Sequence, residues 1–125
     1  MSLSEVIREW SDKPFEYGTA DCCQFVGAVV EEVTGNNPMD GFSYTDQRGA
    51  ESAIDGDLQA RITEVLGDPI PVSQAKNGDV LMIDMDGKPL VAIMLGGQAV
   101  YKTSHGITDW PASVAVCAWS AECRK

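Results

Sequence analysis

The sequence predicts an α+β domain in which N-terminal helices pack on a C-terminal antiparallel sheet. Two observations lead to this prediction. Apolar residues recur at helical spacing in the first half of the chain, and short β-branched or apolar runs separated by glycine-containing turns make up the second half. The chain has 125 residues and no linker or repeat divides it, so we expect a single domain over residues 1–125.

Two amphipathic helices are predicted before residue 36. The first has apolar residues at the i, i+3, i+4, i+7 spacing of one helical face: Leu3, Val6, Ile7 and Trp10. The second begins after Asp21, a residue type that caps helix N-termini, and has the apolar stripe Cys22, Phe25, Val26, Val29, Val30 and Val33. Gly35 and the Asn36-Asn37-Pro38 run end it. We expect this second helix to be the central one.

Two shorter helices are predicted between residues 46 and 66. Asp46 is placed to cap a short helix that carries Ala50, Ala53 and Ile54. A further helix fits the spacing of Leu58, Ile62, Val65 and Leu66. Gly67 and the Pro69–Pro71 segment end that helix, because glycine terminates helices and proline cannot continue them.

After Asn77-Gly78 the periodicity changes and the chain predicts strands. The four runs are Val80–Ile83, Pro89–Leu95, Gln98–Lys102 and Ser113–Trp119. Turn signals separate them at Asp86-Gly87, Gly96-Gly97 and His105-Gly106. If Gly96-Gly97 forms a two-residue hairpin turn, Leu95 faces Gln98 and Leu90 lies opposite Thr103. The four runs therefore predict an antiparallel sheet.

The charge balance excludes several classes of function. The chain has 9 Lys and Arg residues against 19 Asp and Glu residues, and its net charge of −10 would repel phosphate backbones and anionic lipid. Even the longest apolar runs, such as Leu90–Leu95, are far shorter than the roughly 20 residues of a membrane helix. The opening residues lack the basic region of a secretory signal. We therefore expect no nucleic-acid partner, no membrane span and folding in a cytoplasm.

The four cysteines do not indicate a metal site. Cys22 and Cys23 are adjacent, and the set is too sparse for a secreted disulfide scaffold, so free thiols are expected. Neither this pair nor the step from Cys117 to Cys123 has zinc ligands roughly two to four residues apart. Asp84 and Asp86 lack the further ligands of a calcium loop. We expect no metal or other cofactor.

Cys22 is the candidate nucleophile. If Asp21 caps the helix, Cys22 lies in its first turn, where unpaired backbone N–H groups and the positive end of the helix dipole favour a thiolate. The thiolate is the reactive form of a nucleophilic cysteine. The alternative interpretation is that Cys22 is a small buried residue on the apolar stripe. Cys23 lies about 100° further round the helix and fits a packing role.

Several motifs together carry a resemblance to a known family. They are Asp21-Cys22 at a helix start, the whole Trp10–Cys22 opening, the Ala75–Leu81 segment, the Val91–Gly96 run and the Ala118-Trp119 ending. The set resembles NlpC-type cysteine peptidases, which have a compact papain-like fold and cut peptide links in bacterial cell walls. It is most similar to the small NlpC-like proteins encoded among the tail-tip genes of tailed phages, whose opening reads Trp-x-x-x-Pro-Phe-x-Tyr-Gly-x-x-Asp-Cys.

The resemblance implies a catalytic site that lacks its base. The family's base is a histidine at the start of the strand after the Gly-Asp motif, and the matching residue here is Leu90, which cannot accept a proton. A polar residue that orients the base would match Tyr101 or Lys102. The resemblance thus predicts a papain-like, NlpC-like fold with a broken triad.

One arrangement would restore a base. Side chains alternate along a strand, so Tyr101, Thr103 and His105 would share the face that carries Leu90 if the strand continued to His105. The only histidine of the chain would then reach the end of the sheet where the base is missing. Against this, Ser104-His105-Gly106 has the composition of a turn, where a histidine is usually solvated.

Two functions from different classes remain. The first is a structural or assembly protein of a phage tail tip, made in the host cytoplasm and then part of the virion tail. Its acidic surface and aromatic residues would dock against other tail proteins, such as hub or distal tail components. The alternative is an active peptidoglycan-cleaving cysteine peptidase or amidase with Cys22 as nucleophile, His105 as a displaced base and Tyr101 as an orienting or oxyanion-stabilising group. We favour the first because Leu90 stands at the base position.

Overall fold

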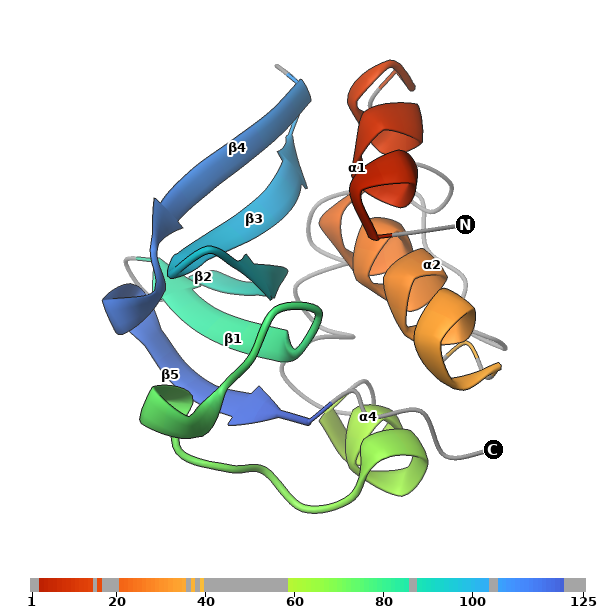
Figure 1. Cartoon of the computed structure of the whole chain (residues 1–125). Helices are drawn as coiled ribbons and strands as arrows, with labels where there is room; N and C mark the ends of the chain where they lie inside the picture. The colour runs from red at the N-terminus through yellow and green to blue at the C-terminus, as the bar shows by residue number, and fades with distance from the viewer. Residues whose placement is uncertain are drawn as a thin grey trace.

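A computed structural model of the chain describes residues 3–14, 16, 21–35, 37, 39, 59–85, 88–103 and 106–120. The helices are α1 (Leu3–Ser11), α2 (Cys22–Thr34) and α4 (Gln59–Leu66), with 3₁₀ turns η2 (Val72–Gln74) and η3 (Ala112–Val114). The strands are β1 (Val80–Met85), β2 (Lys88–Leu95), β3 (Gln98–Thr103), β4 (Gly106–Pro111) and β5 (Ala115–Trp119). Helices precede an antiparallel sheet, so the predicted α+β class is confirmed (Figure 1).

The strand order forces the sheet to curl. The order is β4-β3-β2-β1-β5, so β4 and β5 form opposite edges although only η3 separates them along the chain. In a flat sheet the outer strands would lie four spacings of about 4.8 Å apart, roughly 19 Å in all. The four residue steps from Pro111 to Ala115 span at most about 14 Å. The edges must therefore approach each other at this end, where η3 lies in Figure 1.

Helix α2 begins and ends where local signals predict. The Asp21 carboxylate accepts a hydrogen bond of 2.9 Å from the Gln24 backbone N–H, which satisfies a donor that has no partner within the helix. Gly35 ends the helix with φ +84°, a left-handed conformation that favours glycine, and its N–H donates to the Glu31 carbonyl. The first residue of the helix is therefore Cys22.

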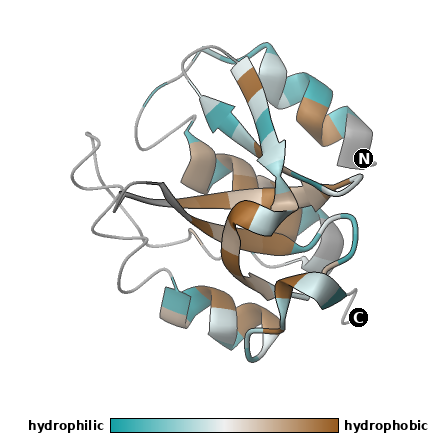
Figure 2. Ribbon diagram, turned by 90° about the vertical axis from the view of Figure 1, so that its left-hand side faces the viewer, coloured by the Kyte–Doolittle hydropathy of each residue, from teal (hydrophilic) through white to brown (hydrophobic). Residues whose placement is uncertain are grey.

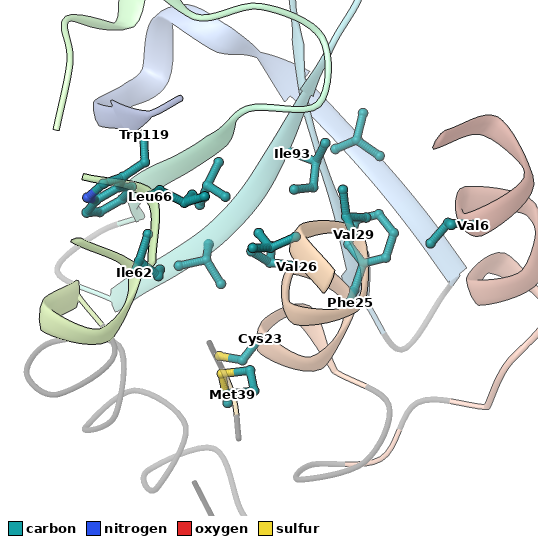
Figure 3. Close-up of a cluster of buried hydrophobic side chains, with 14 of the residues drawn as sticks. Val6, Cys23, Phe25, Val26, Val29, Met39, Ile62, Leu66, Ile93 and Trp119 are labelled. Atoms are coloured by element: carbon teal, nitrogen blue, oxygen red, sulfur yellow. The ribbon is translucent and has the colours of Figure 1, made fainter. Parts of the chain in front are cut away.

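The main core lies between α2 and one face of the sheet. Figure 3 shows part of this cluster, which includes Val6, Phe25, Val26, Val29, Val91, Ile93 and Val100. At one end the rings of Trp10 and Phe25 meet edge to face, with centroids 6.0 Å apart. At the other end Trp119 packs with α4, and its indole N–H donates to the Thr63 hydroxyl over 3.1 Å. Helices α1, α2 and α4 thus share one core.

A second cluster includes the buried residues Leu81, Ile83, Ala92, Ala99, Tyr101, Ala112 and Ala118. Ile70, Val72 and Ala75 pack against it. Its residues on β1, β2 and β3 alternate with those of the main core, as expected for the two faces of a sheet. Both faces of the sheet therefore bury apolar side chains.

The Gly78-Asp79 motif has a structural role at the entry to β1. Gly78 has φ +94° and donates its N–H to the Met94 carbonyl, and the Met94 N–H donates to the Asp79 carbonyl. The Asp79 carboxylate accepts a hydrogen bond from the Lys76 N–H over 2.8 Å. These bonds hold the start of β1 against β2. The Gly78-Asp79 motif therefore has a structural role that requires no part in catalysis.

Some strand predictions are confirmed and others are wrong. The predicted hairpin of β2 and β3 is confirmed by the pairing of Leu95 with Gln98, but the ladder ends at Ile93 and Val100, short of Leu90 and Thr103. Strand β4 was not predicted, and β5 begins at Ala115 rather than at Ser113 because residues 112–114 form η3. The helix predicted after Asp46 and the Asp86-Gly87 turn lie outside the described residues.

None of the helices in the described ranges is long and apolar enough to cross a bilayer. The apolar faces of two of these helices are buried within the domain, since α2 packs on the sheet and α4 packs on β5.

Candidate functional site

The candidate site begins at the N-terminus of α2. Asp21, 1% exposed, fixes the first turn of the helix, and Cys22 follows it with its side chain partly exposed. Cys23 is fully buried in the main core, where it lies beside Met39 (Figure 3). The structure therefore separates the two adjacent thiols: Cys22 is accessible at the helix start and Cys23 is a packing residue, as predicted.

Cys22 lies next to the second cluster of the sheet. Cys22 and Leu90 both pack against this cluster, which contains Tyr101. Cys22 is also close enough to Tyr101 for a charge on its sulfur to affect the ionisation of the phenol. Leu90 on β2 and Tyr101 on β3 face the same side of the sheet, as the alternation of side chains predicted. The site consists of a thiol, a phenol and an aliphatic side chain.

Lys102 lies on the other side of the sheet. It is 2% exposed, and its ammonium group donates a hydrogen bond to the backbone carbonyl of Lys13, just after α1. Successive residues of a strand point to opposite faces, so Lys102 cannot share the face of Tyr101. Of the two residues that the resemblance allowed for the orienting role, only Tyr101 is beside Cys22.

The surroundings of Tyr101 keep its phenol protonated at neutral pH. Burial raises the pKa of Tyr101, a side-chain hydrogen bond with Trp110 opposes this effect, and charges on Cys22 and Asp109 raise the pKa further. The indole of Trp110 is a donor only, so its N–H donates to the phenol oxygen. A neutral phenol can donate a hydrogen bond to a thiolate or an oxyanion, but it cannot take a proton from a thiol.

The described residues contain no complete nucleophile–base pair. Cys22 and Tyr101 are brought together, and Leu90 lies on the Tyr101 face where the family resemblance expects the base. His105 lies outside the described residues, between Thr103 and Gly106, which pair with each other across β3 and β4. In the same described ranges, no group of three or more His, Cys, Asp or Glu side chains is placed to hold a metal ion.

Sequence reasoning missed the contribution of β4 to the site. Tyr101 pairs with Thr108 and Ala99 pairs with Trp110, which places Trp110 diagonally across from Tyr101 on the same face. The signal would have been a strand over Gly106–Pro111 that pairs with β3, because that register alone brings Trp110 to Tyr101.

The model of a family described as "Domain of unknown function (DUF6950)" matches residues 1–121, and the chain therefore belongs to this family. No curated protein matches the sequence. The match extends over the helices, the sheet and every residue of the candidate site. Family membership thus covers the whole described domain, whereas the chemistry of the site has to be inferred from its residues.

We expect the phenol of Tyr101 to ionise above pH 10, which is the approximate pKa of an exposed tyrosine. The difference in ultraviolet absorbance between the wild type and Tyr101→Phe isolates this titration from that of the other tyrosines. Cys22→Ser should lower the midpoint, because it removes a negative charge near the phenolate.

The raised pKa of Tyr101 also makes the stability of the fold depend on pH. Because the folded-state pKa of Tyr101 is raised, its contribution to stability is complete below about pH 10 and is lost as the pH rises through the folded-state value. Urea unfolding of Tyr101→Phe should therefore depend less on pH in this range. An absorbance-titration midpoint of Tyr101 equal to that of the unfolded chain would contradict the described burial of the phenol, and a midpoint that Cys22→Ser leaves unchanged would contradict the described proximity of Cys22 and Tyr101.

Proposed function

We propose that this member of the DUF6950 family is a structural or assembly protein of a phage tail tip, built on an NlpC-like fold that has lost its catalytic base. The observation that supports it most is the composition of the site. Leu90 and the neutral phenol of Tyr101 occupy the sheet face near Cys22, and neither side chain can accept the thiol proton.

The arrangement of the elements supports descent from a papain-like peptidase. A cysteine is the first residue of a capped helix, that helix packs on an antiparallel sheet, and the Gly78-Asp79 motif leads into the first strand. This order is the one that the family resemblance implies. Fold alone does not determine activity, so the proposal rests on the groups around the thiol.

The tail-tip assignment is supported by the residues that match the phage NlpC-like proteins and by the one residue that differs from the active peptidases. Trp10 and Trp119, which match the opening and ending of the phage NlpC-like proteins, are both buried and pack at opposite ends of the core. The shared motifs therefore stabilise the fold, whereas the substituted residue, Leu90, is the one that would have performed chemistry. This combination fits a protein that keeps its shape for assembly with hub or distal tail proteins, first in the host cytoplasm and then in the virion.

A second candidate function is an active peptidoglycan peptidase or amidase. The observation in its favour is that Cys22 is partly exposed at a helix start, with the phenol of Tyr101 close by as a hydrogen-bond donor. In this mechanism His105 would act as the base from the segment between β3 and β4. The favoured proposal and this alternative differ in one feature, which is whether an imidazole reaches the sulfur of Cys22.

Virion composition and peptidoglycan digestion discriminate the two functions. We expect mass spectrometry to find the protein in purified virions of the phage that encodes it, and its absence from them would contradict the tail-tip proposal. We expect neither the wild type nor Cys22→Ala to release muropeptides from purified peptidoglycan, because no base activates the thiol. Release by the wild type alone would establish the peptidase instead.

Leu90→His tests whether this position is the lost base site. A histidine at Leu90 should form an ion pair with the Cys22 sulfur, since both residues pack against the cluster of Tyr101. We expect the rate of iodoacetamide labelling of Cys22 at pH 6 to rise about tenfold or more. Mass mapping of labelled peptides distinguishes Cys22 from the other thiols.

Leu90→Asn is the matched control, because it introduces a polar side chain of similar size that is not a base. Its labelling rate should stay near that of the wild type. If Leu90→His folds, as judged by circular dichroism, and labels no faster than Leu90→Asn, then residue 90 does not face the thiol and the proposed loss of the base at this position is wrong.

A further inference from the structure

Asn77-Gly78 is the one Asn-Gly pair of the sequence, and it lies in the turn that leads into β1. Asn77 is exposed, whereas Gly78 is buried. In water an asparagine followed by glycine is chemically labile, because a residue without a Cβ leaves its nitrogen unhindered for attack on the preceding side chain. The pair is therefore a candidate site of spontaneous modification.

The chemistry uses the two residues of this pair and water. The Gly78 nitrogen forms a bond to Cγ of Asn77, and the bond from Cγ to the side-chain nitrogen breaks. The side-chain nitrogen takes up the proton that Gly78 loses and leaves as ammonia, so that a five-membered succinimide remains. Water then opens this ring. Hydrolysis at the side-chain carbonyl gives aspartate, and hydrolysis at the backbone carbonyl gives isoaspartate.

The fold holds the attacking nitrogen away from this reaction. The Gly78 N–H donates to the Met94 carbonyl on β2 over 2.8 Å. The turn around the pair is closed by a bond of 3.0 Å from the Asp79 N–H to the Lys76 carbonyl, and the Asp79 carboxylate accepts from the Lys76 N–H over 2.8 Å. A nitrogen whose hydrogen is donated to a neighbouring strand cannot turn toward Cγ until that bond breaks.

The side chain under attack is held as well. Oδ1 of Asn77 accepts a hydrogen bond of 2.8 Å from the Gly96 N–H, at the start of the hairpin turn between β2 and β3. The attacking nitrogen is thus tied to Met94, and the attacked carbonyl group is tied to Gly96, two residues further along the chain. Both bonds have to break before the two groups can meet.

We propose that Asn77 is a modification site that the fold keeps closed. Succinimide forms only after the turn over residues 76–79 has separated from β2, and the isoaspartate that follows prevents the turn from docking there again. The Asn77 site goes beyond the proposed tail-tip function and does not depend on it, because it uses no residue of the candidate site.

Isoaspartate and aspartate differ in their effect on the main chain. Isoaspartate adds one carbon between residues 77 and 78, which displaces the Gly78 N–H from the Met94 carbonyl. Aspartate leaves the main chain unchanged and still offers an oxygen to the Gly96 N–H. The turn leads directly into β1, and the strands β1 and β2, in the middle of Figure 2, supply apolar side chains to both clusters. Displacement of the turn therefore disturbs the core.

The first test compares deamidation of Asn77 in the folded chain and in the chain unfolded by guanidinium chloride. Mass spectrometry of the tryptic peptide 77–88 measures the reaction, since Asn77 is the only residue in it with a side-chain amide. Hydrogen exchange of the Gly78 amide measures how often the same N–H leaves Met94. We expect folding to slow deamidation at least about tenfold, and by at least the factor by which it slows the exchange. A smaller slowing in either respect would overturn the proposal.

Asp79→Ala tests the role of the turn, because it removes the acceptor of the Lys76 N–H. Deamidation of Asn77 in the folded variant and exchange of the Gly78 amide should both rise at least about threefold. Asp68→Ala, at an exposed aspartate outside the turn, is the matched control and should deamidate like the wild type. A folded Asp79→Ala that deamidates at the wild-type rate would contradict the proposal. The comparison of folded and unfolded wild type does not depend on whether this variant folds.

The two products test whether isoaspartate keeps the turn from docking. The isoaspartate form is separated by chromatography after reaction in the unfolded chain, peptide mapping selects molecules altered at residue 77 alone, and these are refolded. We expect Asn77→Asp to melt like the wild type, and the isoaspartate form to melt at a lower temperature with exchange of the Gly78 amide at least about tenfold faster. An isoaspartate form that melts and exchanges like Asn77→Asp would show that the turn still docks, and would overturn this part of the proposal.

Discussion

The hydrogen bond from the Gln24 backbone to the Asp21 carboxylate determines where α2 begins, and the candidate site depends on that position. Caps of this kind contribute about 1 kcal/mol to stability, and here the cap also makes Cys22 the first residue of the helix. The cap therefore places Cys22 in the first turn, and the packing of Phe25, Val26, Val29 and Val30 on the sheet sets the rotation of the helix that leaves Cys22 partly exposed and Cys23 buried.

The pairing of β4 with β3 provides the other half of the site. Ala99 pairs with Trp110 and Tyr101 with Thr108, so β4 carries Trp110 to the side of Tyr101. Tyr101 consequently links two surfaces, since it lies near Cys22 and accepts a hydrogen bond from the exposed indole.

The sequence predicts the elements that have local signals and fails where a signal requires the register of distant residues. Helix α2 follows from a capping aspartate, an apolar stripe and a terminal glycine. Strand β4 has no fully buried side chain in its described pattern, so there was no hydrophobic alternation to detect. Leu90 and Tyr101 were placed on one face by alternation alone, whereas the neighbourhood of Trp110 depends on the pairing of β3 with β4. Lys102, a polar residue on a strand, was an ambiguous candidate until its burial against Lys13 was known.

The proposed loss of catalysis requires that no imidazole reaches the Cys22 thiol, and His105 is the one histidine of the sequence. The imidazole signals of this histidine can be followed by nuclear magnetic resonance through a pH titration of the wild type and of Cys22→Ala. We expect the same midpoint in both proteins. A midpoint higher in the wild type by about one pH unit or more would show that a thiolate stabilises the imidazolium, and the proposed loss of the base would then be wrong.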